Sequence, residues 1–143
     1  MYNIAYVDLT NQKVTIKDIP QKLRQMFLGG RGINMYLLYN HVKKGVQPLA
    51  PENTLIFGAG LLTGMQVVAS ARYNVSARSP HSGLIGDSNA GGFFGPELRF
   101  AGFDHLVITG KAAKPTYLWI HDGHIEFRDA SHLNDLNTTE TFE

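Results

Sequence analysis

The chain has 143 residues, 43% hydrophobic and 17% charged, which suits a single globular domain with a buried core, here expected over residues 1–143. A net charge of +1, spread over scattered basic and acidic residues, argues against nucleic acid or an anionic membrane surface as a partner. No membrane-spanning run or secretion signal is visible, so we expect a cytoplasmic protein. Without cysteine, the chain forms no disulfide and supplies no thiolate to a metal or an iron–sulfur cluster.

The first half of the chain predicts a β-hairpin, two short helices and two strands. Apolar residues in 4–9 and 13–19 follow a strand pattern, and Asn11-Gln12 suits the turn between them. After Pro20, apolar residues recur at helical spacing on both sides of the glycine-rich segment 29–32. Residues 54–58 and 73–77 then predict two short strands.

The second half begins with a segment, residues 81–95, that contains five glycines. This density predicts irregular backbone that approaches another group closely. A short helix is expected from Pro96 to Phe100, followed by strands at 105–109, 116–120 and 125–127, the last two joined by an Asp122-Gly123 turn. The polar tail after residue 131 predicts no element. The whole pattern indicates an α+β fold that is mainly β.

The run from Ser88 to Gly95 is the clearest candidate for a binding loop. Small and polar residues before a helix can direct backbone N–H groups at an anion. A tight structural turn is the alternative, since such loops are common between a strand and a helix. The run lacks the lysine of a phosphate-binding loop and the glycine spacing of a dinucleotide fingerprint.

Three arginines flank this loop in the sequence: Arg72, Arg78 and Arg99. The planar guanidinium donates two parallel hydrogen bonds and suits phosphate or the edge of a heterocycle. Arg72 is expected at the start of a buried strand, where its charge needs a partner. The partner is either an anionic ligand or a structural carboxylate such as Asp87 or Glu97.

The histidines and carboxylates show no catalytic or metal-binding spacing. The histidines are dispersed, so each is interpreted as an ordinary surface or turn residue, and Asp104 is interpreted as a turn residue. No nucleophile elbow or Ser/His/Asp arrangement is present. We therefore assign no catalytic residue from the sequence.

Several stretches, in order and over almost the whole chain, resemble the aldehyde ferredoxin oxidoreductase family. They include Phe27-Leu28-Gly29-Gly30-Arg31-Gly32, Arg72-Tyr73-Asn74-Val75 with Ser79-Pro80, Ser88-Asn89-Ala90-Gly91-Gly92-Phe93-Phe94-Gly95-Pro96-Glu97-Leu98, Phe100-Ala101-Gly102-Phe103-Asp104 and Arg128-Asp129-Ala130-Ser131-His132-Leu133.

The resemblance implies a two-sheet N-terminal domain that binds two molybdopterin-type cofactors, which together hold one tungsten or molybdenum. By the same resemblance, Arg72 lies between the pterin and a 4Fe-4S cluster, and Asn89 offers a backbone oxygen to a magnesium ion that links the pterin phosphates. Gly91 corresponds to a pterin-contacting position, and Ala90 and Gly92 line the same turn.

The family implies an oxidoreductase that converts a small aldehyde to a carboxylic acid and passes electrons to ferredoxin. The 4Fe-4S cluster is expected only from a cysteine-bearing part, supplied by missing C-terminal domains or a second chain. Two alternatives stay open: a non-catalytic pterin-binding module, and an inert gene fragment. The last predicts exposed apolar surface where other domains once packed.

Overall fold

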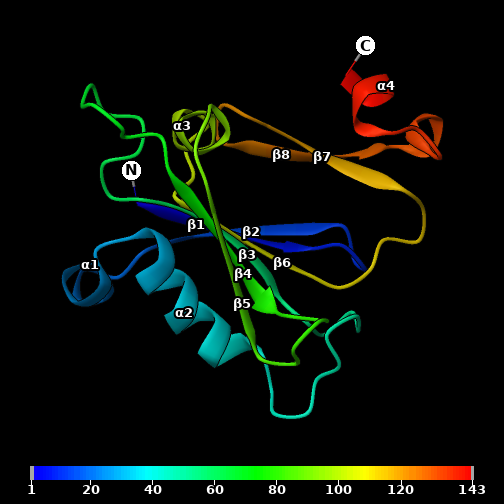
Figure 1. The fold of residues 1–143 in the computed structure, drawn as a ribbon, viewed down its shortest axis with the longest axis horizontal. Coiled ribbons are helices and arrows are strands. Elements are labelled where there is room, and N and C mark those ends of the chain that lie inside the picture. The colour runs from blue at the N-terminus through cyan, green and yellow to red at the C-terminus, as the bar shows by residue number, and fades with distance from the viewer. Residues whose placement is uncertain (1, 143) are drawn as a thin grey trace.

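The structure, a computed structural model described here for residues 2–142, contains a six-stranded sheet, a separate two-stranded sheet and short helices (Figure 1). The α+β, mainly β prediction with two sheets is confirmed. The elements are β1 (Asn3–Asp8), β2 (Lys13–Asp18), α1 (Gln21–Phe27), α2 (Gly30–His41), β3 (Leu55–Ala59), β4 (Tyr73–Arg78), β5 (Ile85–Ala90), α3 (Phe94–Phe100), β6 (His105–Thr109), β7 (Thr116–His121), β8 (His124–Asp129), the 3-10 helix η1 (Ser131–Leu133) and α4 (Thr138–Phe142).

The larger sheet has the strand order β2-β1-β6-β3-β4-β5. β1 and β6 are parallel, and every other neighbouring pair is antiparallel. Helix α2 packs on one face, where its apolar side chains join those of β1, β3 and β6 in a core that includes Ile4, Ile33, Leu37, Ile56 and Val107. The other face packs against α3 and the β7–β8 hairpin around Ala5, Leu98, Phe103, Leu106 and Ile120. The sheet is thus covered on both sides.

Both predicted hairpins form, and local turn chemistry explains them. In the β1–β2 turn, one carboxylate oxygen of Asp8 accepts hydrogen bonds from the backbone N–H groups of Thr10 (2.9 Å) and Asn11 (3.0 Å). In the β7–β8 turn, Asp122 and Gly123 have φ values of 43° and 79°. Positive φ at both central residues is what a two-residue hairpin turn with the twist of the flanking strands requires.

Two expectations from the sequence are wrong. The glycine-rich segment contains a regular strand, β5, although Gly86, Asp87, Ser88 and Asn89 have low strand propensity. Its pairing with β4 over six residue pairs overrides that propensity. The tail after residue 131, expected to have no element, forms η1 and α4. Among residues 2–142, no helix is long and apolar enough to cross a membrane.

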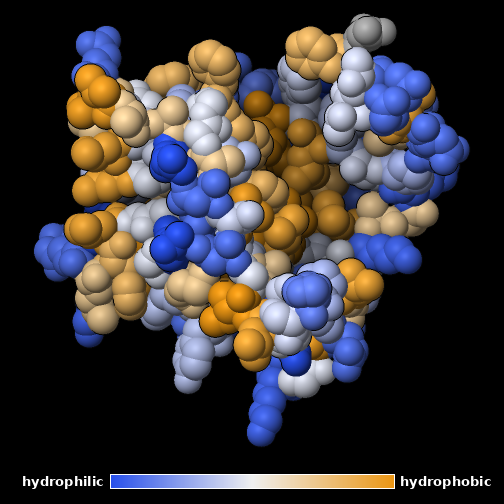
Figure 2. All heavy atoms as spheres, viewed as in Figure 1, coloured by the Kyte–Doolittle hydropathy of each residue, from blue (hydrophilic) through white to orange (hydrophobic). Residues whose placement is uncertain are grey.

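Apolar side chains are exposed in the loop between β3 and β4 and in the segment that leads into α3. Val68 is 95% exposed and Phe93 is 85% exposed, while Phe100 on α3 is also largely exposed. Figure 2 shows hydrophobic side chains gathered on the visible face, including a hollow on the side where α3 and the β7–β8 hairpin lie. Leu98, Phe100, Trp119 and Ile120 line a groove between these elements. The chain alone therefore leaves several large apolar side chains exposed to solvent.

Candidate cofactor site

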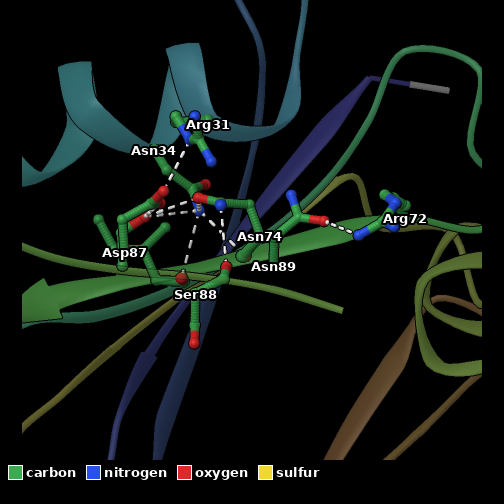
Figure 3. A network of polar contacts seen from close by, with 9 residues as sticks. Arg31, Asn34, Arg72, Asn74, Asp87, Ser88 and Asn89 are labelled. Carbon is green, nitrogen blue, oxygen red and sulfur yellow. Dashed lines mark hydrogen bonds and ion pairs between the residues drawn. The ribbon is translucent and has the colours of Figure 1, made fainter. Parts of the chain in front are cut away.

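The structure brings together all five residues expected to bind the cofactor. Arg72 lies just before β4, Asn89 and Ala90 end the neighbouring strand β5, and Gly91 and Gly92 form the turn toward α3. The guanidinium Nη1 of Arg72 donates a hydrogen bond of 2.9 Å to Oδ1 of Asn89 (Figure 3). The antiparallel pairing of β4 with β5 causes this proximity, because it aligns Tyr73 with Ala90.

The expectation that Arg72 lies at the start of a buried strand is wrong, because its side chain is exposed. It precedes β4 and points away from the core, so this chain alone imposes no desolvation penalty on its charge. Its partner is the Asn89 amide oxygen rather than a carboxylate. Asp87, the carboxylate considered in the sequence, pairs instead with Arg31 at 2.7 Å. Because a neutral amide leaves the arginine's charge uncompensated, this guanidinium remains suited to an anion.

The other two arginines near the loop have structural partners. Arg78 donates from Nε to the Gly83 carbonyl at 2.8 Å and from Nη1 to the Val46 carbonyl. Arg99 pairs with Asp104 at 3.2 Å and donates to two carbonyls of the loop before β4, at 2.7 and 2.9 Å. Burial raises the pKa of the Asp104 carboxyl, although the Arg99 charge opposes that rise. Asp104 lies in the bend before β6, where a turn residue was expected, but it is also a buried ion-pair residue, which the sequence did not indicate.

The glycines of the loop differ in what they permit. A Cβ added at Gly95 would lie 3.1 Å from Cγ2 of Thr63 and 3.2 Å from the Ala71 carbonyl, so internal packing explains this glycine. A Cβ at Gly91 or Gly92 would meet no atom within 4 Å. Gly92 has φ = 84°, which favours glycine. At Gly91 neither packing nor φ calls for glycine, so the open backbone there fits close approach by a flat ligand.

Between α2 and the strands β4 and β6 lies a cluster of buried polar side chains that the sequence did not predict, which we call the buried polar cluster: Asn34, Asn74, Ser76 and His105, all at most 2% exposed. Nδ1 of His105 lies 2.8 Å from Oδ1 of Asn34. Because that oxygen only accepts, Nδ1 carries the proton of the neutral ring. Burial lowers the pKa of His105 to about 3, so the ring is neutral at physiological pH.

His105 contradicts the expectation that each histidine is a surface or turn residue. Two sequence signals could have revealed this cluster: a histidine that opens the apolar run of β6, and Asn34 between the core residues Ile33 and Leu37 of α2. A polar residue on an apolar face needs a partner, and here the two are partners of each other. Gly58 makes the meeting possible, because a Cβ there would lie 2.2 Å from Oδ1 of Asn34.

A half-buried histidine, His121, interacts with carboxylates on the β7–β8 hairpin. Its ring nitrogens lie 3.2 Å from Glu126 and 3.3 Å from Asp122, and these hydrogen bonds raise its pKa. Among residues 2–142, no three histidine, aspartate or glutamate side chains are grouped closely enough to hold a metal ion.

Comparison with known proteins identifies the family. Residues 4–143 match the family model described as aldehyde ferredoxin oxidoreductase, N-terminal domain. The chain belongs to the aldehyde ferredoxin oxidoreductase family. The resemblance noted in the sequence is confirmed, and so is the assignment to the N-terminal domain of that family.

Two relatives from Pyrococcus furiosus illustrate the range of this family. The chain is 45% identical over 135 residues to a tungsten-containing aldehyde ferredoxin oxidoreductase, covering 94% of this chain and 22% of the relative. It is 36% identical over 140 residues to an aliphatic sulfonate oxidoreductase, WOR-like subunit, covering 96% of this chain and 22% of that relative. The chain thus spans about a fifth of the length of these relatives.

A solved structure has the same fold. The active site complex BamBC of benzoyl coenzyme A reductase, in complex with 1,5-dienoyl-CoA, superimposes with a TM-score of 0.89 and 40% sequence identity. The match covers 92% of this chain and 20% of that one. Family members named for different reactions therefore share this N-terminal domain.

Proposed function

We propose that residues 1–143 form a single domain that binds the pterin cofactor of a cytoplasmic tungsten or molybdenum oxidoreductase. In this proposal the complete enzyme oxidises a small aldehyde to a carboxylic acid and passes the two electrons to ferredoxin. The tungsten-containing aldehyde ferredoxin oxidoreductase at 45% identity supports this reaction class. The chain contributes the cofactor-binding surface and no catalytic residue.

The observation that carries the proposal is the Arg72–Asn89 pair beside an open glycine turn. The two side chains are 2.9 Å apart, and both are exposed. A ligand that lies over Gly91 and Gly92 would meet backbone without side-chain obstruction, because a Cβ at either position has nothing within 4 Å. A phosphorylated, sulfur-rich pterin is flat and anionic, which fits an exposed guanidinium and an open main chain.

Each residue has a distinct task in this proposal. Arg72 would hold the anionic cofactor with its planar donors, and Asn89 would orient that guanidinium through its side chain while its backbone carbonyl binds a magnesium ion. Ala90, Gly91 and Gly92 would form the wall against which the pterin lies. When bound, the metal–pterin cofactor would supply the two-electron oxidation of the aldehyde, with water providing the added oxygen.

The remaining parts of the active site would come from outside this chain. The sequence has no cysteine, so a 4Fe-4S cluster would require cysteines of further C-terminal domains or of a second chain. The exposed side chains of Val68, Phe93 and Phe100 are consistent with such a neighbour.

The test is cofactor retention. The chain is produced in tungstate-containing medium, alone and with a chain that carries the cysteine-containing remainder, and its pterin, tungsten, molybdenum and magnesium are measured. We expect pterin in at least the second preparation. Absence of pterin from both would refute the proposal and favour the inert fragment, whereas stoichiometric pterin without metal or redox activity would favour the non-catalytic binding module.

A second candidate reaction is a reduction. The benzoyl coenzyme A reductase complex is 40% identical to this chain, close to the value for the aldehyde-oxidising relative. The same cofactor domain would then serve a reductase of an activated aromatic acid. Assays of the assembled enzyme with an aldehyde and with an aromatic coenzyme A thioester distinguish the two reactions.

A further inference from the structure

The buried polar cluster links the core of the domain to the edge strand that carries the candidate cofactor site. His105 on β6 bonds to Asn34 on α2, and the Asn34 amide donates to the backbone carbonyl of Asn74 on β4 at 3.1 Å. Nδ2 of Asn74 then donates to the carbonyl of Ser88 on β5 at 2.9 Å. Ser88 directly precedes Asn89, so this series of contacts ends next to the proposed site (Figure 3).

We propose that Asn74 is a positioning residue for the cofactor site: by holding the Ser88 carbonyl, it fixes the backbone and side chain of Asn89 and, through Asn89, the guanidinium of Arg72. The proposal rests on the proposed function, since it assigns how that same site is kept in its binding geometry. Asn74 itself is buried at 2% exposure, so in this proposal it acts through its neighbours.

The first argument is that β5 needs such an anchor. It is an edge strand, paired only with β4 among the described strands, and the residues around its site end have weak strand propensity. Asn89 is opposite Asn74 in the register. The hydrogen bond from the Asn74 side chain to the Ser88 carbonyl therefore adds a contact close to the end of the pairing, which runs to Tyr73 and Ala90.

The second argument is that neighbouring groups fix the orientation of the Asn74 amide. Oγ of Ser76 donates to Oδ1 of Asn74 at 2.9 Å. The Asn34 amide lies 3.4 Å from the same oxygen. With Oδ1 held as the acceptor, Nδ2 is the atom that faces β5 and donates to Ser88. A buried asparagine that is satisfied on both sides is held in one orientation.

The third argument is a second brace at the adjacent residue of β5. Nε of Arg31, on the first turn of α2, lies 2.7 Å from Oδ2 of Asp87. The single hydrogen of the Ser76 hydroxyl is donated to Asn74, so the 3.5 Å separation between its Oγ and the other oxygen of that carboxylate is not a second hydrogen bond. Arg31 holds Asp87 and Asn74 holds Ser88, which leaves the following residue, Asn89, in a defined position.

The experiment compares Asn74→Ala with a matched control, Asn53→Ala, in the full chain. Asn53 is half-buried and also anchors β4, because its Nδ2 donates to the Arg78 carbonyl at 3.0 Å and its Oδ1 accepts from the Arg78 N–H at 3.2 Å. Arg78 is the last residue of β4, at the end opposite the candidate site. Asn53→Ala loses side-chain hydrogen bonds to β4, and Asn74→Ala loses the one to β5. Only Asn74→Ala therefore loses the contact with Ser88.

Two quantities are measured for each variant: pterin retained per folded chain after production in tungstate-containing medium, with and without the cysteine-bearing remainder, and hydrogen–deuterium exchange of the backbone amides. We expect Asn74→Ala to retain roughly three- to tenfold less pterin, the range that one net hydrogen bond supports. Amides of residues 85–90 should exchange faster while those of β1 and β6 do not. Asn53→Ala should retain pterin at the wild-type level.

Equal pterin retention by the two variants, or exchange that rises uniformly over the sheet, would overturn the positioning role. If the wild-type chain holds no pterin in either preparation, the proposed function fails, and the exchange pattern alone decides whether Asn74 positions β5. If Asn74→Ala does not fold, Ser76→Ala removes the bond that orients the Asn74 amide, and the same criteria apply to it.

Discussion

Replacing Gly58 with alanine tests whether the buried polar cluster is as tightly arranged as the structure indicates. The new Cβ would lie 2.2 Å from Oδ1 of Asn34 and 2.6 Å from Nδ1 of His105. Both distances are well inside van der Waals contact, and both neighbours are completely buried. Either the strand or the Asn34–His105 pair must move.

The size of the effect follows from these two costs. Forcing an extra methyl group into a packed core costs about 1–3 kcal/mol. Separating Asn34 from His105 leaves buried donors and acceptors without partners, at about 1–3 kcal/mol more. The sum, about 2–6 kcal/mol, is a large part of the ~5–15 kcal/mol that keeps a typical domain folded. Gly58→Ala should therefore unfold at a much lower urea concentration.

The assay is urea unfolding followed by circular dichroism, with Gly91→Ala as the control. A Cβ at Gly91 meets nothing within 4 Å, so that variant should stay within about 0.5 kcal/mol of the wild type. An unfolding midpoint of Gly58→Ala equal to that of the control would show that the close approach of Asn34 and His105 at this glycine is incorrect.

Two further predictions concern a buried histidine and two arginines. Burial lowers the pKa of His105 from 6.5 to about 3, so as the pH falls the unfolded chain binds a proton before the folded one does. The free energy of unfolding should therefore fall as the pH drops from 6.5 toward 3, by up to about 1.4 kcal/mol per pH unit. His105→Asn, which keeps a donor near Nδ1, should show a smaller slope in urea titrations, and an identical slope would contradict the buried neutral ring. Arg72→Ala should lower pterin retention with little change in stability. Arg99→Ala should lower the free energy of unfolding by about 2–4 kcal/mol, because Asp104 loses its partner. Thermal unfolding and pterin assays that show the opposite pattern would reverse these roles.

Local patterns account for most of the fold. Alternation and the turn residues Asn11-Gln12 and Asp122-Gly123 predicted both hairpins, because such turns are specified by residues close together in the sequence. The strand β5 could not be predicted in this way. Its residues Gly86 to Asn89 form a strand only because β4 pairs with them, and such tertiary pairing is not encoded in local propensity.

The candidate site was predicted by resemblance more than by local chemistry. The glycine count indicated the loop, but only the structure separates Gly95, which is packed, from Gly91, which is open. The spacing of Arg72 and Asn89 in the sequence does not reveal that they are hydrogen-bonded across two strands. The expectation that Arg72 is buried was wrong, because the burial of a side chain depends on which parts of the chain pack over it in space, and its position next to a strand does not specify them.

The buried polar cluster also bears on whether this chain is an inert remnant. Buried polar groups destabilise a fold unless their partners are present. Asn34, Asn74 and Ser76 have partners, whereas Nε2 of His105 is buried without one. Loss of one partner would cost about 1–3 kcal/mol, so a sequence without functional constraint would not be expected to keep the contacts among Asn34, Asn74 and Ser76 intact. We therefore expect the chain to unfold in one cooperative urea transition, with midpoints that agree between circular dichroism and Trp119 fluorescence. Because Trp119 lies on β7 in the smaller sheet, its fluorescence reports on a different sheet from the one that contains the cluster. A broad transition, or two separate midpoints, would instead favour a loosely packed remnant whose exposed apolar side chains have lost the surface they once covered.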